Sequence, residues 1–129
     1  YYLKHSKVFV MASKVEGFPN SMVEAMAHGV PIVTTDSPGA CGEIIGMKKN
    51  IGSRLEIQYC SYGILTPRIS EKVKRQEALS NEEVLLGKAL ESVLVNQELY
   101  KKYNIQSRKR AAMYSKERVM NMWNACISI

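Results

Sequence analysis

Two carboxylates frame the stretch of this chain in which chemistry is most readily placed. Glu16 lies in a glycine-containing loop, and Glu24 follows eight positions later, one turn into an expected helix. Backbone N–H groups at the start of that helix, together with the helix dipole, favour an anion such as a phosphate. Carboxylates accept hydrogen bonds in pairs, which suits the vicinal hydroxyls of a sugar or ribose ring. The residue types and spacing therefore indicate a pocket for a nucleotide sugar.

A structural role is open for both carboxylates. The run from Ser21 to Glu24 has the spacing of a capping box, in which Glu24 would only secure the start of the helix. Spacing alone does not choose between capping and ligand binding for Glu24. Glu16 has the alternative of a solvated loop residue. A paired-carboxylate glycosidase is disfavoured, because no second catalytic acid is indicated.

The elements around this stretch predict a parallel βαβ unit. An apolar strand at 8–11 precedes the loop, the helix runs from Ser21 to a stop at Gly29, and a β-branched strand follows at 30–35. Two further loop glycines, Gly39 and Gly42, could approach a phosphate, but a glycine pair is weak evidence.

The rest of the chain predicts one more strand and then helices. Residues 62–67 form a strand stopped by proline, whereas 47–61 stay unassigned, with an edge-like alternation near 55–59. A charged connector at 68–79 leads to a capping box at Ser80. Three helices are then expected. The first carries one core-facing apolar stripe of Val84, Leu86, Leu90, Val93 and Leu94, the second (97–114) carries basic residues, and the third carries Val119 to Ile127. This order is typical of half of a doubly wound α/β fold.

Bulk properties allow one soluble domain of 129 residues with 46% apolar residues. No apolar run approaches the roughly 18 residues of a membrane-spanning helix. Because the chain begins with Tyr1 and enters a strand almost at once, we expect a piece of a longer protein. Tyr2 and Leu3 are expected to pack inward. Three cysteines without CxxC spacing, and His5 and His28 without ligand spacing, argue against a disulfide framework or a metal site.

The run from Lys14 to Asp36, read KVEGFPNSMVEAMAHGVPIVTTD, resembles the donor-site signature of the family 4 retaining glycosyltransferases, the "group 1" enzymes of GT-B architecture. Residues 62–67, the helix after Ser80 and the region from Arg110 to Trp123 are similar to the same family. The resemblance implies an α/β fold, the Rossmann-like half of a GT-B enzyme, with a short parallel sheet flanked by helices. The chain (1–129) would be one C-terminal nucleotide-sugar-binding domain that ends in a helical tail (97–129).

The resemblance also implies a role for each residue of the motif. Glu16 would stand at the catalytic centre and hold hydroxyls of the transferred sugar, without acting as a nucleophile. Glu24 would bind the ribose, which favours ligand binding over capping. The other donor-binding residues would offer backbone amides to the sugar or face the diphosphate from the helix start: Gly17, Phe18, Pro19, Asn20 and Ser21.

The implied activity is that of a retaining hexosyltransferase in surface polysaccharide biosynthesis. It would move a sugar from a nucleotide sugar, expected to be a UDP-sugar, to a glycan or lipid-linked acceptor. No metal or other cofactor is expected, in agreement with the lack of an Asp-x-Asp cluster. The expected location is the cytoplasm, with peripheral contact to the inner face of the membrane and no nucleic acid partner.

Two departures from the family pattern limit the implied activity. The run from Pro38 to Glu43 reads PGACGE where relatives often have Pro-Gly-Gly-Pro, so contacts from this loop stay unassigned. The acceptor-binding N-terminal domain, and the Arg and Lys that neutralise the leaving diphosphate, would precede residue 1. We therefore expect this piece alone to lack turnover.

A function of a different class rests on the net charge of +6, most of which lies between Gln97 and Arg118. A basic helical face near 101–110 could make the chain a non-catalytic module that binds anionic lipid or nucleic acid with a steep salt dependence. A solvated face is the commoner outcome. Nucleic acid is the weaker choice, because only Tyr100, Tyr103 and Tyr114 interleave the basic residues.

Overall fold

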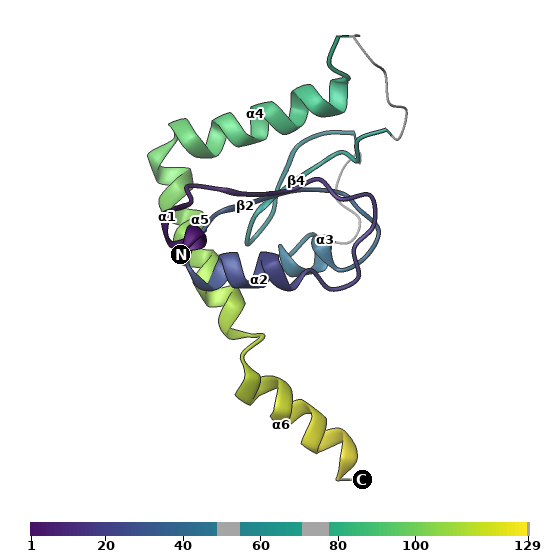
Figure 1. Cartoon of the computed structure of the whole chain (residues 1–129), viewed down its shortest axis with the longest axis vertical. Coiled ribbons are helices and arrows are strands. Elements are labelled where there is room, and N and C mark those ends of the chain that lie inside the picture. Colours follow the sequence, from purple (N-terminus) through teal and green to yellow (C-terminus); the bar gives the residue numbers. More distant parts are fainter. Residues whose placement is uncertain (49–54, 71–77, 129) are drawn as a thin grey trace.

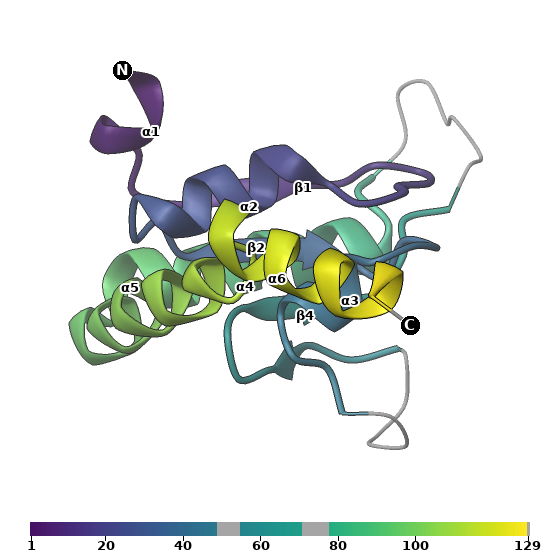
Figure 2. The same ribbon diagram turned by 90° about the horizontal axis from the view of Figure 1, so that it is seen from below.

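One sheet forms the centre of the fold. The structure of the chain, a computed structural model, describes residues 1–48, 55–70 and 78–128. Within these residues the sheet has the strand order β1-β2-β4-β3, and Figure 2 shows β1, β2 and β4 side by side. These three strands run parallel, whereas β3 pairs antiparallel with β4 at the edge. The strands are β1 (Phe9–Met11), β2 (Ile32–Thr35), β3 (Gln58–Tyr59) and β4 (Ile64–Thr66).

Helices cover both faces of the sheet (Figure 1). Helix α4 lies over one face, and α2 and α3 lie over the other. The helices are α1 (Tyr2–His5), α2 (Asn20–Ala27), α3 (Cys41–Ile44), α4 (Asn81–Val95), α5 (Gln97–Ala112) and α6 (Lys116–Ile127). This layered arrangement confirms the predicted α/β class, with a short parallel sheet flanked by helices.

Strand β2 is buried along its whole length because both faces of the sheet are covered. Successive side chains of a strand point to opposite faces. Ile32 therefore packs in the core beneath α2 and α3, while Val33 packs in the core shared with α4 and α5. In β4, Leu65 packs in the first of these cores and Ile64 packs in the second. Burial on both faces explains why these strands read as continuous apolar runs.

The predicted βαβ unit is confirmed. Strands β1 and β2 pair in parallel, and α2 packs on them through Met22, Ala25 and Met26. These three residues form one helical stripe, with spacings of three and four. Helix α2 ends before Gly29, whose φ of 74° is a left-handed conformation that glycine adopts without strain.

The capping box at Ser80 is also confirmed. The Ser80 N–H donates to a carboxylate oxygen of Glu83 at 2.7 Å, and the Ser80 hydroxyl accepts from the Glu83 N–H at 3.2 Å. Helix α4 therefore begins where the sequence predicts. Asn96 and Ser115 accept backbone N–H bonds in the same way at the starts of α5 and α6.

The buried face of α4 agrees with the predicted one only in part. Val84 and Leu94 are 37% and 55% exposed, so their prediction as core residues is wrong. The prediction is confirmed for Val93, which is fully buried, and for Leu86 and Leu90, which pack against the same core. Ala89, which was not predicted, is also fully buried there. Because Ala89 is small, the helix can approach the sheet closely at this point. This docking decides which apolar side chains of α4 are buried.

Two stretches near the edges of the sheet complete the comparison with the prediction. Tyr2 is 83% exposed, so only Leu3 packs against the core as predicted. Strand β3 lies in the stretch that the sequence left unassigned. Residues 49–54 of that stretch, and 71–77 of the charged connector, lie outside the described residues.

Helix α5 packs along α2 and bonds to its end. Asn104 Nδ2 donates to the Gly29 carbonyl at 2.7 Å, and Arg108 Nη2 donates to the His28 carbonyl at 3.0 Å. These bonds satisfy carbonyls that the end of a helix leaves without intrahelical partners. Part of the predicted basic face is therefore used inside the domain. The buried residues of α5 are Tyr103, Ser107 and Ala111.

The Ser107 hydroxyl is buried and has no hydrogen-bond partner among the described residues. We expect Ser107→Ala to raise the free energy of unfolding by about 1 kcal/mol, because it removes a polar group desolvated without compensation. Urea denaturation measures this change.

Ser92→Ala is the matched control, because the Ser92 hydroxyl donates to the Ala89 carbonyl at 2.7 Å. Both changes replace a helical serine by alanine, so their shared gain in helix propensity cancels. A Ser107→Ala variant less stable than Ser92→Ala would contradict the prediction.

Helix α6 extends away from the body of the domain (Figure 1) and has no buried residue. Met122, Trp123 and Ile127 are each more than half exposed. Within the described part of the chain, no helix combines the length and apolarity needed to cross a bilayer.

Candidate functional site

The glycine loop lies at the carboxyl end of β1. It spans residues 12–19 and leads into α2 at Asn20. The loop that begins at Asp36 follows β2, and Pro67 follows β4, so three segments meet at the same edge of the parallel sheet. In open α/β sheets, ligands bind outside the carboxyl ends of the strands. The fold thus places the predicted site residues where such a domain binds ligands.

The first two of these segments are bonded to each other. The Glu16 N–H donates to the Pro38 carbonyl at 3.0 Å, and the Ala40 N–H donates to the Gly17 carbonyl at 3.0 Å. The Ser37 hydroxyl donates to the Ser13 carbonyl. These three hydrogen bonds make the glycine loop and residues 36–40 one structural unit.

Gly39 permits this close approach. Its φ of 121° is a conformation that L side chains rarely adopt, and a Cβ there would lie 1.6 Å from the Glu16 carbonyl oxygen. The sequence indicated Gly39 only as a residue that could approach phosphate. The structure shows that it packs against the backbone of the predicted site.

Glu24 does not cap α2. The N-cap residue is Pro19, and within the described chain no side chain forms a cap hydrogen bond at this helix. The capping box from Ser21 to Glu24 therefore does not form, because the helix begins at Asn20, two residues earlier than that box requires. Glu24 is exposed, on the side of α2 opposite the buried Met22 and Met26. Its carboxylate is thus left outside the helix-start hydrogen bonds.

Glu16 is half-buried beside residues 36–40, and Asn20 and Ser21 are exposed on the first turn of α2. The positive end of the α2 dipole therefore faces the same edge of the sheet as the glycine loop. This first turn and the loop form a continuous surface that offers backbone N–H groups and carboxylates, the groups that bind phosphates and hydroxyls.

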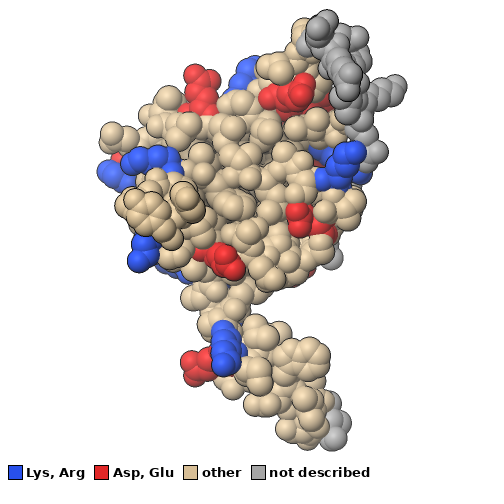
Figure 3. All heavy atoms as spheres, in the orientation of Figure 1, with Lys and Arg blue, Asp and Glu red and all other residues tan. Residues whose placement is uncertain are grey.

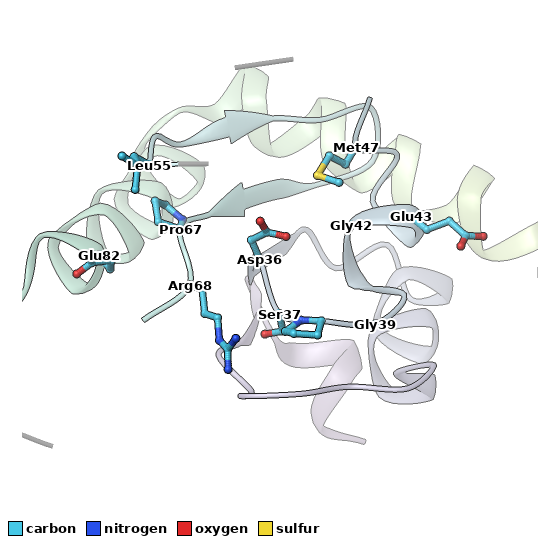
Figure 4. Close-up of a pocket in the computed structure, with 11 residues that line it drawn as sticks. Asp36, Ser37, Gly39, Gly42, Glu43, Met47, Leu55, Pro67, Arg68 and Glu82 are labelled. Atoms are coloured by element: carbon cyan, nitrogen blue, oxygen red, sulfur yellow. The ribbon is translucent and has the colours of Figure 1, made fainter. Parts of the chain in front are cut away.

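A cavity of about 750 Å³ adjoins this surface at the ends of β2 and β4. Figure 4 shows the Asp36 carboxylate and the Met47 side chain pointing into the cavity, while the Arg68 guanidinium lies alongside Ser37. Of the described residues that line the cavity, none belongs to the predicted set from Glu16 to Glu24. Asp36 and Arg68 were not predicted as site residues from the sequence. Their signal was present, because each follows the carboxyl end of a predicted strand.

Cys41 is the one cysteine near the glycine loop among the described residues, and it is not poised as a nucleophile. Burial raises the pKa of its thiol, and the nearby charge of Glu16 contributes in the same direction. The reactive form of cysteine is the thiolate. Cys41 therefore stays a neutral thiol, packed against Met11 in the core.

A parallel sheet between helical layers, with a glycine loop and a helix start at the carboxyl ends of its strands, defines the class of Rossmann-like ligand-binding domains. The solved structure of sucrose-phosphate synthase from Thermosynechococcus elongatus has this fold, with a TM-score of 0.66 and 20% identity. The match covers 98% of this chain and 27% of that chain. The chain thus has the fold of one domain of a GT-B glycosyltransferase.

Sequence comparisons find similarity to glycosyltransferases. The sequence model described as "Glycosyl transferases group 1" matches residues 1–58. An uncharacterized glycosyltransferase of Methanocaldococcus jannaschii is 30% identical over 131 residues, which cover 98% of this chain and 32% of the relative. One from Haemophilus influenzae is 26% identical, over 98% of this chain and 29% of the relative. These findings support a group 1 glycosyltransferase domain, and the chain spans about a third of the length of these curated relatives.

A shorter match is to a Vi polysaccharide biosynthesis protein of Salmonella typhi. It is 40% identical over 40 residues, which cover 31% of this chain and 7% of that protein.

Proposed function

We propose that this chain is the donor-binding domain of a retaining glycosyltransferase that transfers a sugar from a nucleotide sugar, expected to be a UDP-sugar. The observation that carries the proposal is the position of the glycine loop and the α2 start at the carboxyl edge of the sheet, with Glu24 outside the helix cap. The acceptor would be a glycan or a lipid-linked sugar of a surface polysaccharide. The Vi polysaccharide relative supports this last point over 40 residues.

Each residue of the proposed site acts through groups that its position leaves available. Glu16 accepts hydrogen bonds from hydroxyls of the transferred sugar, and the backbone of Gly17, Phe18 and Pro19 lines that position. Asn20 and Ser21 face the diphosphate from the first turn of α2, where the helix dipole favours negative charge. Glu24 binds the two ribose hydroxyls.

The reaction that we propose needs no protein nucleophile and no metal ion. The sequence has no Asp-x-Asp cluster, and Glu16 holds the sugar rather than attacking it. Acceptor binding and diphosphate neutralisation would depend on residues of a longer protein. We place the reaction in the cytoplasm, beside the membrane that would carry a lipid-linked acceptor.

The alternative of an anion-binding module has less support. Arg108 and Arg110 donate to backbone carbonyls within the domain, and Lys101 pairs with Glu98 at 3.5 Å. On the face drawn in Figure 3, basic and acidic side chains both lie around the edge rather than in one basic patch. We therefore favour the donor-binding function.

Glu24→Ala tests this function. We expect the variant to bind UDP at least about tenfold more weakly than the wild type, because hydrogen bonds to a charged group contribute about 1.5–3 kcal/mol. Isothermal titration of the 129-residue chain with UDP, GDP and ADP measures the affinities.

Glu91→Ala is the matched control, since Glu91 is an exposed glutamate on α4. It should bind the nucleotides as the wild type does. Equal affinities for Glu24→Ala and Glu91→Ala would refute the ribose role, and a wild type that binds none of the three nucleotides would refute the proposed function.

A further inference from the structure

One side chain at the end of α5, Arg110, contacts several other segments. The Arg110 guanidinium lies over the ring of Tyr62 and over the ring of Tyr114, at 5.0 Å and 5.1 Å from their centroids. Its Nε donates to the Ile44 carbonyl at 2.8 Å, and Nη2 donates to the Glu43 carbonyl at 2.8 Å. Arg110 thus binds the last carbonyls of α3, where a cation is also favoured by the helix dipole.

Tyr114 extends this cluster to the glycine loop. Its ring meets the ring of Phe18 edge to face, with the centroids 5.3 Å apart and the planes at 69°. This is the geometry that aromatic pairs prefer. Burial raises the pKa of Tyr114, although Arg110 beside it opposes the shift, so the ring stays a neutral phenol at physiological pH. Tyr114, which lies outside the glycine loop, therefore fixes the position of the loop at Phe18.

The two contacts act on one unit. The glycine loop is bonded to residues 36–40, which lead directly into α3. Tyr114 holds this unit at Phe18, and Arg110 holds it at the far end of α3. The relative position of the two loops is thus fixed from two points on the same helix end.

We propose that Arg110 and Tyr114 are positioning residues of the donor site. They touch neither sugar nor nucleotide, and they act by fixing the backbone of the glycine loop against α3. The inference rests on the proposed function, because the backbone that they fix is the one assigned to the sugar and diphosphate. A site whose supporting residues let it shift by about 0.5 Å binds measurably less well.

The same cluster borders α6. A groove of about 490 Å³ is lined by Arg110 and Tyr114 together with Val119 and Trp123 of α6. Ser115, the first residue after Tyr114, caps α6. Tyr114 therefore contacts the glycine loop through Phe18 and also borders α6, so a change in the position of α6 would reach the glycine loop through Tyr114.

Substitution of the Tyr114 ring tests the proposal. We expect Tyr114→Leu to weaken binding of the best of UDP, GDP and ADP by about three- to tenfold, the loss that corresponds to one aromatic pair. Tyr114→Phe should restore wild-type affinity, because it keeps the ring and loses only the hydroxyl. Phe18→Leu should weaken nucleotide binding as much as Tyr114→Leu does. The double variant should bind no more weakly than either single variant.

Arg108→Met separates positioning from general stability. Arg108 also donates from α5 to a helix-end carbonyl, but at the far end of α2, away from the glycine loop. The Arg108→Met substitution should lower the melting temperature and leave the nucleotide affinity unchanged. Titrations are done well below the melting temperature, with folding of each variant checked by circular dichroism.

The outcomes distinguish this inference from the proposed function. Tyr114→Leu within twofold of wild-type affinity, or a loss shared equally by Arg108→Met, overturns the inference and leaves the proposed function standing. Additive losses for Phe18→Leu and Tyr114→Leu also overturn it. Absence of binding by the wild type overturns both.

Discussion

Gly39→Ala is expected to lower the free energy of unfolding by about 1–3 kcal/mol through backbone strain alone, the usual cost of forcing an L-residue into such a backbone region. The steric cost comes in addition, because the new Cβ would lie 1.6 Å from the Glu16 carbonyl oxygen. Backbone atoms cannot move away as the tip of a flexible side chain can. The loop pair must therefore separate, and the bonds from Glu16 to Pro38 and from Ala40 to Gly17 are lost with it.

Urea denaturation measures the loss of stability, and nucleotide titration measures its effect on the site. Gly87→Ala is the control, because a Cβ there meets no atom within 4 Å and alanine is the better helix former. We expect it to raise the unfolding free energy by about 0.8–1 kcal/mol. A Gly39→Ala variant as stable as the wild type would show that the two loops are not packed as described.

Tyr103→Ala is expected to lower the free energy of unfolding by about 3–5 kcal/mol, as for other large buried side chains replaced by alanine. Tyr103 is fully buried between α5 and the sheet, in the core with Val33 and Val93. Its hydroxyl donates to the Cys60 carbonyl at 3.1 Å. Tyr103→Phe keeps the packing and loses this one bond, so it should cost only about 1 kcal/mol. Equal losses for the two variants, measured by urea denaturation, would contradict this account.

Tyr103 also makes stability depend on pH. Burial raises the pKa of its phenol above the value of about 10 in an unfolded chain. The unfolded state therefore loses this proton at a lower pH than the native state. The contribution of the buried phenol to the free energy of unfolding is full below about pH 10 and falls as pH rises further. Between about pH 9 and pH 11, Tyr103→Phe should lose less stability than the wild type. Tyr1→Phe, at a residue that is 90% exposed, should follow the wild type.

Local sequence was sufficient for the order of elements around the site. The apolar runs at β1 and β2, and the stop at Gly29, predicted the βαβ unit because each element carries its own periodicity and boundary residues. The capping box at Ser80 predicted the start of α4 for the same reason. These signals lie within a few residues of each other in the chain.

Interactions between distant segments were not predictable. The box from Ser21 to Glu24 has the right spacing but does not form, because the helix begins at Asn20. Val84 and Leu94 were predicted to share one buried stripe with Val93, but only Val93 is fully buried, because docking on the sheet decides which of these side chains is covered. Arg110 read as part of a basic surface, yet its guanidinium binds carbonyls 66 and 67 residues earlier in the chain.

By itself, the sequence determined the α/β class, the strand, loop and helix that carry Glu16 and Glu24, and the resemblance to group 1 glycosyltransferases. Each of these depends on the types and spacing of neighbouring residues. Only the tertiary structure decided that Gly39 packs on the backbone of Glu16, that Glu24 is free of the helix cap, and that Tyr114 holds Phe18. The physical reason is that van der Waals contact and hydrogen bonding act over a few ångströms in space, whatever the separation along the chain.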